Sequence, residues 1–165
     1  KMRIVSFSNF NGSQGTEVIG VFNSDSFEIE EKRNLLAVSF VCNIEPENMS
    51  KLFASLGSSS IYGISTGKGS VTVFTSSEEP NELMKRLHNL NISKALSCRS
   101  NVGLIEVAHP VFIDSPGWVA KVSGALASRK INIIEITTSK ATINIFIDES
   151  KIEDAVKIVR DALES

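Results

Sequence analysis

The residues best suited to do chemistry lie in the tract Asp114-Ser115-Pro116-Gly117-Trp118. Asp114 and Ser115 are favourable helix caps, and Pro116 has the backbone angle of a first helical turn. Gly117 permits close approach to the backbone. The N–H groups at a helix start have no partner within the helix and attract a carboxylate. The same residues also make an ordinary cap and turn, so the tract alone predicts a helix start and leaves binding open.

Other reactive side chains lack the neighbours that catalysis or metal binding requires. His88 and His109 have no adjacent nucleophile pattern and no metal-ligand spacing. Cys42 ends an apolar run and is expected in the core, whereas Cys98 stands beside Arg99, which favours a lowered thiol pKa. The two cysteines lie far apart without a CxxC spacing. We therefore predict no catalytic residue, no metal site and no disulfide framework.

Composition narrows the classes of function. The chain has 165 residues, 42% of them hydrophobic, which is enough to bury a core. Its net charge of -2 provides no basic surface, so nucleic acid and anionic membranes are poor candidates for partners. No apolar run is long enough to span a bilayer, and no N-terminal charged-then-apolar signal is present. We expect a cytoplasmic protein.

The C-terminal part predicts the order strand, helix, strand, strand, helix. Leu104–Val107 is the first strand, and Val119, Val122 and Leu126 fall on one face of the helix that follows. Two β-branched runs, Ile131–Thr138 and Thr142–Ile147, predict paired strands. A capping box, Ser150 with Glu153, opens the closing helix, whose inner face carries Ile152, Ala155, Val156, Val159 and Leu163.

The same order occurs earlier in the chain. The predicted elements are a strand at Leu35–Asn43, a helix with Met49, Leu52, Phe53 and Leu56 that ends at Gly57, strands at Ile61–Ser65 and Val71–Thr75, a helix from Pro80, and a strand at Ile92–Ser97. The tract ISTGKGSVTVFT mirrors ITTSKATINIFI. Two ferredoxin-like units of about sixty residues account for nearly the whole chain.

The C-terminal unit resembles an ACT domain. The tract SPGWVAKVSGAL followed by INIIEITTSKATINIFID is similar to the second ACT domain of aspartate kinases, where a Pro-Gly loop, an Ile-Asn-Ile strand and a Thr/Ser tract follow in that order. The resemblance implies an α+β fold of two ferredoxin-like βαββαβ ACT domains, the first inserted in the second. Residues 35–100 would be the first domain, and residues 26–34 with 101–165 the second. Phe27–Glu31 would supply the fourth strand that the C-terminal unit lacks.

The N-terminal segment Lys1–Gly20 resembles the last strand and exit loop of the aspartate kinase catalytic domain. Asn9, Gly15 and Thr16 match that pattern. An ordinary N-terminal hairpin is the alternative on local evidence. The resemblance implies that residues 1–25 are the tail of a kinase domain and its linker, and that the natural chain continues upstream of Lys1.

The resemblance implies a regulatory fragment that senses amino acids. Its parent would phosphorylate L-aspartate with ATP and Mg²⁺ and be inhibited by lysine, threonine or both. The fragment itself would be non-catalytic and hold no cofactor. Its partners would be the amino-acid effector, its own kinase domain and a second copy in a homodimer, with no nucleic acid and no membrane. A free-standing ACT-type protein that binds a small molecule is the alternative, and an RNA-binding pair of ferredoxin-like units is disfavoured by the charge balance.

The resemblance also implies an effector site where the first strand of the second unit meets its first helix. Asp114 would bind the ammonium and the N–H groups of Gly117 and Trp118 the carboxylate, usually across an interface with another ACT unit. Lysine is the preferred effector. The full predicted set is Asp114, Ser115, Pro116, Gly117, Trp118, Asn132, Ile133 and Ser139. Lys140 departs from the family, in which a glutamate usually follows this serine.

The first unit departs further from the family pattern. Glu47 stands where the family carries a glycine, so it would crowd the backbone and repel a carboxylate. The polar groups left for a possible second site there are Asn43, Asn48, Met49 and Ser65.

Overall fold

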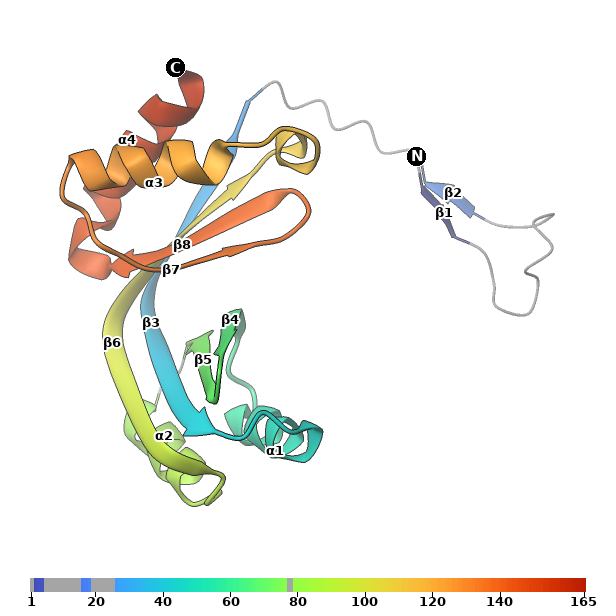
Figure 1. Cartoon of the computed structure of the whole chain (residues 1–165), viewed down its shortest axis with the longest axis vertical. Helices are drawn as coiled ribbons and strands as arrows, with labels where there is room; N and C mark the ends of the chain where they lie inside the picture. The colour runs from blue at the N-terminus through green and yellow to red at the C-terminus, as the bar shows by residue number, and fades with distance from the viewer. Residues whose placement is uncertain (1, 5–15, 19–25, 77–78) are drawn as a thin grey trace.

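Two βαββα units share one antiparallel sheet in this computed structural model, which describes residues 2–4, 16–18, 26–76 and 79–165 (Figure 1). The elements are β3 (Glu28–Cys42), α1 (Pro46–Leu56), β4 (Ile61–Gly67), β5 (Ser70–Thr75), α2 (Pro80–His88), β6 (Ser93–Ala108), η2 (Pro110–Ile113), α3 (Trp118–Ser128), β7 (Ile133–Thr138), β8 (Thr142–Asp148), η3 (Glu149–Lys151) and α4 (Ile152–Glu164). The sheet order is β4-β5-β3-β6-β8-β7. β1 (Met2–Ile4) and β2 (Thr16–Val18) form a separate antiparallel pair.

The strands β3 and β6 each serve both units. The first part of β3 pairs with the end of β6, from Glu28 opposite Ala108 to Lys32 opposite Leu104. The second part of β3 pairs with the beginning of β6 and with β5. The predicted fold class, with the first unit inserted in the second, is therefore confirmed, because the start of β3 completes the sheet of the C-terminal unit.

Both long strands pass from one unit to the other at an asparagine. Asn34 in β3 and Asn101 in β6 have φ of 58° and 57°, a left-handed conformation that asparagine tolerates better than most residues. The pairing register shifts between Lys32 and Leu35, beside Asn34. Each long strand had been predicted as two separate strands. That prediction was wrong, because a single left-handed residue bends a strand without ending its ladder of hydrogen bonds.

Each unit has its own core beneath its helix pair. In the first unit the core residues are Leu36, Val38, Phe40, Cys42, Leu52, Leu56, Val71, Val73, Leu83 and Leu87. In the second they are Ile105, Val107, Val122, Leu126, Ile131, Ile143, Ile145, Ile147, Ile152, Ala155, Val159 and Leu163. The predicted inner faces of the helices are largely confirmed. Phe53 and Val119 are exceptions, since they are 39% and 40% exposed.

A third cluster joins the two units on the sheet face that the helices leave uncovered. Phe74 and Phe146 stack there with their ring centroids 3.7 Å apart. Gly63 lies against this pair, and a Cβ atom at Gly63 would stand 2.7 Å from the Phe146 ring. Close approach of β4 to the rings therefore requires glycine at this position.

Two helices begin differently from the prediction. A short 3-10 helix, η2, begins at Pro110, and α3 starts only at Trp118, with Gly117 rather than Asp114 or Ser115 as its N-cap. The predicted capping box of α4 is also absent. Asp148 accepts a hydrogen bond from the Ser150 N–H at the start of η3 instead. In both places the residue predicted to cap the α-helix belongs to a 3-10 turn instead. Asp114 is the C-cap of η2, and Ser150 lies within η3.

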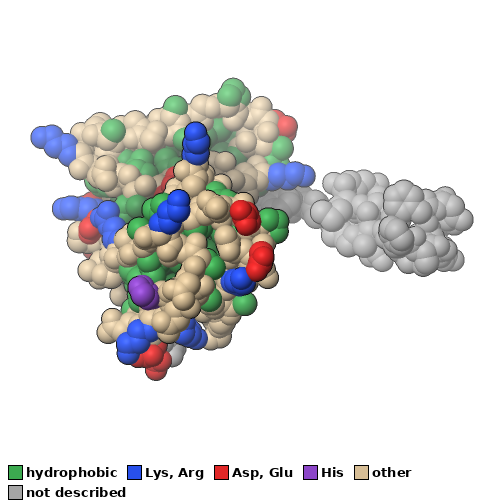
Figure 2. Space-filling model, turned by 60° about the horizontal axis from the view of Figure 1, so that its bottom comes forward, with side chains coloured by type: hydrophobic (Ala, Val, Ile, Leu, Met, Phe, Trp, Pro, Cys, Tyr) green, Lys and Arg blue, Asp and Glu red, His purple; other side chains and the backbone are tan. Residues whose placement is uncertain are grey.

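The predicted kinase tail falls mostly outside the described residues. Asn9 and Gly15 are not described, and Thr16 begins β2. Among the described residues, no helix is both long and apolar enough to cross a membrane. On the face drawn in Figure 2, Lys and Arg side chains lie scattered among Asp and Glu.

Candidate functional site

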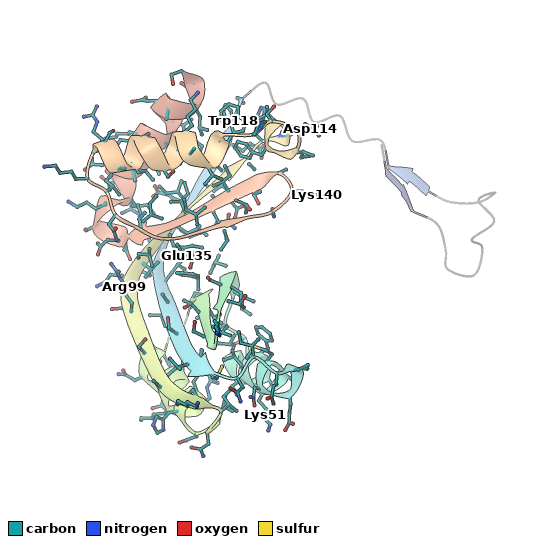
Figure 3. The ribbon with its side chains drawn as sticks, in the orientation of Figure 1. Lys51, Arg99, Asp114, Trp118, Glu135 and Lys140 are labelled. Carbon is teal, nitrogen blue, oxygen red and sulfur yellow. The ribbon has the colours of Figure 1, made fainter. Side chains whose placement is uncertain are left out.

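A groove of about 560 Å³ opens where the loop before α3 meets the turn between β7 and β8. Figure 3 shows Asp114 on this loop and Trp118 at the start of α3, with Lys140 at the tip of the neighbouring hairpin. The groove is lined by Phe112, Ser115, Pro116, Gly117, Trp118, Val119, Ala120, Thr138, Ser139, Thr142 and Ile143. Its walls therefore combine the start of a helix with the hydroxyls of a hairpin.

The N-terminal end of α3 is open at this groove. Gly117 is the N-cap with φ of 97°, and no side chain caps the helix. A Cβ atom at Gly117 would meet nothing within 4 Å. The first N–H groups of a helix lack intrahelical partners and carry partial positive charge. This end of α3 can accordingly bind a carboxylate.

The hairpin contributes polar groups on the other side of the groove. The N–H of Ser139 donates to the Thr142 carbonyl at 3.0 Å, which closes the turn. The hydroxyls of Ser139 and Thr142 are hydrogen-bonded to each other. Both residues line the groove, so these hydroxyls can donate to or accept from a bound polar molecule.

An aromatic cluster packs against the segment that leads into α3. Phe27 lies with its ring centroid 4.4 Å from His109, 5.8 Å from Phe112 and 5.3 Å from Trp118. His109 Nδ1 accepts a hydrogen bond from the Val111 N–H at 3.0 Å, so His109 both packs in the cluster and orders the turn that follows it. The loop is thereby fixed to the start of β3. Sequence reasoning missed this cluster because Phe27 is remote in the chain, and only the aromatic character of the His109–Phe112 segment hinted at it.

Trp118 has a polar atom without a partner. Its Nε1 is buried and has no hydrogen-bond partner among the residues that the structure describes. The ring itself is partly buried, and the Lys121 ammonium lies 5.2 Å from its centroid. Trp118 therefore covers the aromatic cluster, and its indole N–H is a donor that remains unused.

The structure divides the predicted effector residues into two groups. Ser115, Pro116, Gly117, Trp118 and Ser139 all line the groove.

Asp114 is exposed and next to the groove without lining it. Asn132 and Ile133 lie at the other end of the unit, after α3, whose 11 residues span about 16 Å. Asn132 and Ile133 therefore do not join the loop within one unit, and their part in an effector site shared with another unit stays a prediction. Ile133 is the first residue of β7 and Asn132 precedes it, whereas the groove is formed at the last residues of that strand.

The possible second site does not come together. The Asn48 side chain donates to the Asn43 carbonyl at 3.1 Å, which joins these two residues. Met49 packs against the core of the first unit. Ser65 stands opposite Thr72 on the sheet face away from α1, because Val71 and Val73 occupy the helix-covered face. Asn43, Asn48 and Met49 thus lie at or in α1, and Ser65 lies on the opposite side of the sheet.

Two side chains have shifted pKa values that bear on the predictions: Glu47 in the first unit and Cys98 in β6. A hydrogen bond from Lys51, at 2.6 Å, lowers the pKa of Glu47, which keeps a negative charge in the first turn of α1. Partial burial raises the pKa of the Cys98 thiol, and Arg99 is directed to Asp148 instead. Within the described parts of the chain, no group of three or more His, Cys, Asp or Glu could hold a metal ion.

Known proteins are similar to this chain in sequence over one part and in structure over most of it. Residues 98–161 match the family model described as ACT domain. No curated protein matches the sequence.

Three solved structures illustrate the structural similarity. Clostridium acetobutylicum aspartate kinase is 18% identical with a TM-score of 0.73, and the match covers 81% of this chain and 34% of that one. The ligand-free regulatory subunit of Thermus thermophilus aspartate kinase is 19% identical with a TM-score of 0.72, covering 81% and 95%. E. coli aspartokinase III in complex with lysine and aspartate is 17% identical with a TM-score of 0.65, covering 87% and 34%.

The chain therefore spans about a third of the two complete kinases and nearly all of the separate regulatory subunit. Over residues 98–161 the chain is thus similar to ACT domains, and its fold is that of the regulatory regions of aspartate kinases.

Proposed function

We propose that this chain is the amino-acid-sensing regulatory region of an aspartate kinase. The observation that carries the proposal is the uncapped start of α3 at Gly117, which opens on a groove lined by hydroxyls. The parent enzyme would phosphorylate L-aspartate with ATP and Mg²⁺. Residues 1–25 would lead from its kinase domain, residues 35–100 would form the first ACT domain, and residues 26–34 with 101–165 the second.

Lysine is the proposed effector. Its carboxylate would accept hydrogen bonds from the N–H groups of Gly117 and Trp118, and Asp114 at the rim would bind an ammonium group. Ser139 would complete the polar wall. The similar E. coli aspartokinase III is in complex with lysine and aspartate, which supports this class of ligand.

A second copy of the chain would complete the site. Ile133 begins the edge strand β7 and Asn132 directly precedes it, so a second ACT unit placed beside that edge would bring its own Asn132 and Ile133 to the loop. We expect a dimer by sedimentation at micromolar concentration, strengthened by lysine. A clean monomer with lysine bound at full affinity would contradict a shared site.

Calorimetric titration tests the effector. Lysine and threonine would be titrated separately into wild type, Asp114→Ala and the matched first-unit variant Glu47→Ala. We expect lysine affinity to fall about ten- to a hundredfold in Asp114→Ala, because a charge-assisted hydrogen bond is lost, and to stay unchanged in Glu47→Ala. The reverse pattern would assign the site to the first unit, and no heat with either ligand would refute sensing by this chain.

A free-standing regulatory protein is a second candidate. The observation in its favour is that the chain covers 95% of the Thermus thermophilus regulatory subunit. The genomic reading frame separates the two candidates. A kinase-like sequence running directly into Lys1 supports a regulatory region, and a start codon near Met2 supports a separate protein.

A further inference from the structure

A second groove, of about 500 Å³, lies at the opposite end of α3 from the loop at Gly117. It is formed where the turn after α3 meets the start of α4, two segments that lie close together in Figure 1. Its lining residues are Arg129, Lys130, Ile131, Lys151, Asp154, Lys157 and Ile158. Four cationic side chains thus surround one carboxylate in a chain whose net charge is -2.

These cations are unpaired. The ion pairs among described residues involve none of Arg129, Lys130, Lys151 and Lys157. The first unit offers a direct comparison, because the repeat that matches Phe74 with Phe146 also matches Lys85 with Lys157. Lys85 binds Glu82 at 2.7 Å, whereas Lys157 forms no such bond with Asp154, the equivalent of Glu82. Positive charge is neutralised at the first-unit position and left free in the second.

Helix dipoles account for only part of this cluster. Arg129 and Lys130 follow the C-terminal end of α3, where cations are favoured. Lys151 is the N-cap of α4, which has no side-chain cap hydrogen bond, and a helix N-terminus favours acidic groups instead. Glu153 and Asp154 in the first turn of α4 offset the dipole of that helix, so the excess positive charge at this groove comes from its four cationic side chains.

The groove also has an apolar floor. Ile131 is 9% exposed, and Ile158 is partly buried against the core of the second unit. The volume lies within the range of about 300–1,000 Å³ typical of small-molecule sites. A ligand with both an anionic group and an apolar or ring portion would use the cations and the floor together.

We propose that this groove binds an organic phosphate, with its phosphate group among Arg129, Lys151 and Lys157 and its carbon portion against Ile131 and Ile158. The site is separate from the loop at Gly117, since α3 spans about 16 Å between them. Guanidinium and ammonium groups suit phosphate because its oxygens accept several charge-assisted hydrogen bonds at once.

Titration with adenosine monophosphate, followed by ¹⁵N amide shifts and calorimetry, tests the proposal. We expect shifts at residues 129–131 and 151–158, weaker binding at higher ionic strength, and weaker binding by inorganic phosphate and by citrate. The double variant Lys151→Glu, Lys157→Glu should weaken adenosine monophosphate at least about tenfold, and the control Lys85→Glu should not.

Equal affinity in the double variant and the control, or shifts confined to other residues, would overturn the site. Citrate binding as tightly as adenosine monophosphate would overturn the choice of phosphate. Both variants change exposed side chains, and circular dichroism would confirm that they fold. Lysine affinity at the loop at Gly117 should be the same in both, so failure of the phosphate site and failure of the effector site are distinguishable.

Discussion

The two units have the same order of elements but different helix starts at the equivalent loop. In the first unit α1 begins directly at Pro46, after Glu45 in an extended conformation, and Glu47 is paired with Lys51 in the first turn. In the second unit η2 intervenes, and a left-handed Gly117 opens the helix start. The first turn of α1 thus carries a negative charge, whereas the first turn of α3 has no acidic residue. The two units thus share a scaffold, and of the two helix starts only that of α3 has a left-handed glycine cap without an acidic residue in its first turn.

The largest effect is expected where the two units are most alike. Phe74→Ala and Phe146→Ala should each lower the free energy of unfolding by about 3–5 kcal/mol, because each removes one ring of the buried stacked pair. Denaturant unfolding of both variants measures this. A small loss for one and a large loss for the other would mean that the units do not share this cluster equally.

The next largest effect is expected at Gly117, the left-handed cap that α3 has and α1 lacks. Gly117→Ala should lower stability by about 1–2 kcal/mol, since φ of 97° is strained for any residue with a Cβ, although space for that Cβ is available. Lysine binding should weaken in the same variant. Gly124→Ala, an open position inside α3, is the matched control and should not destabilise. Equal stability of the two variants would show that the left-handed cap is not required.

A pH effect on stability is expected from Asp148 in the second unit. Hydrogen bonds from the Ser150 side chain and N–H, and then from Arg99, lower the pKa of Asp148. A lowered folded-state pKa stabilises the protein above the unfolded pKa, and this stabilisation is lost as the pH falls below about 4. Asp148→Asn should flatten the acid limb of stability against pH. Ser76→Ala, at the equivalent first-unit position, should leave that limb unchanged, and an identical acid limb in both variants would refute the assignment.

The smallest effect concerns the exposed pair in the first unit. Glu47→Gln removes the ion pair with Lys51, and both side chains are largely exposed, so stability should change very little. If the charge of Glu47 is what excludes a carboxylate there, Glu47→Gly should allow weak lysine binding to the first unit. Calorimetry of Glu47→Gly in an Asp114→Ala background would detect it. A silent titration would attribute the exclusion to the extended Glu45 backbone.

Sequence patterns predicted the architecture better than the site. Alternation in the tract Thr142–Ile147 and the mirrored tract of the first unit were sufficient for the strands, because burial of one face imposes that period. Continuity of β3 through Asn34 was not predictable, since a left-handed asparagine inside a strand looks like a turn. The start of α3 was missed because η2 precedes it. The distance between Asn132 and the loop was not predictable, because it depends on the length of α3.

Because β3 and β6 continue through the bends at Asn34 and Asn101, the two units are expected to unfold together. Both β3 and β6 run through the two units, so neither the N-terminal nor the C-terminal half of the chain contains all the strands of one unit. Heating should therefore give a single calorimetric transition, with equal calorimetric and van't Hoff enthalpies, rather than two. A force that tilts one unit would likewise reach its neighbour through two hydrogen-bonded strands, with no flexible tether between the units to absorb it.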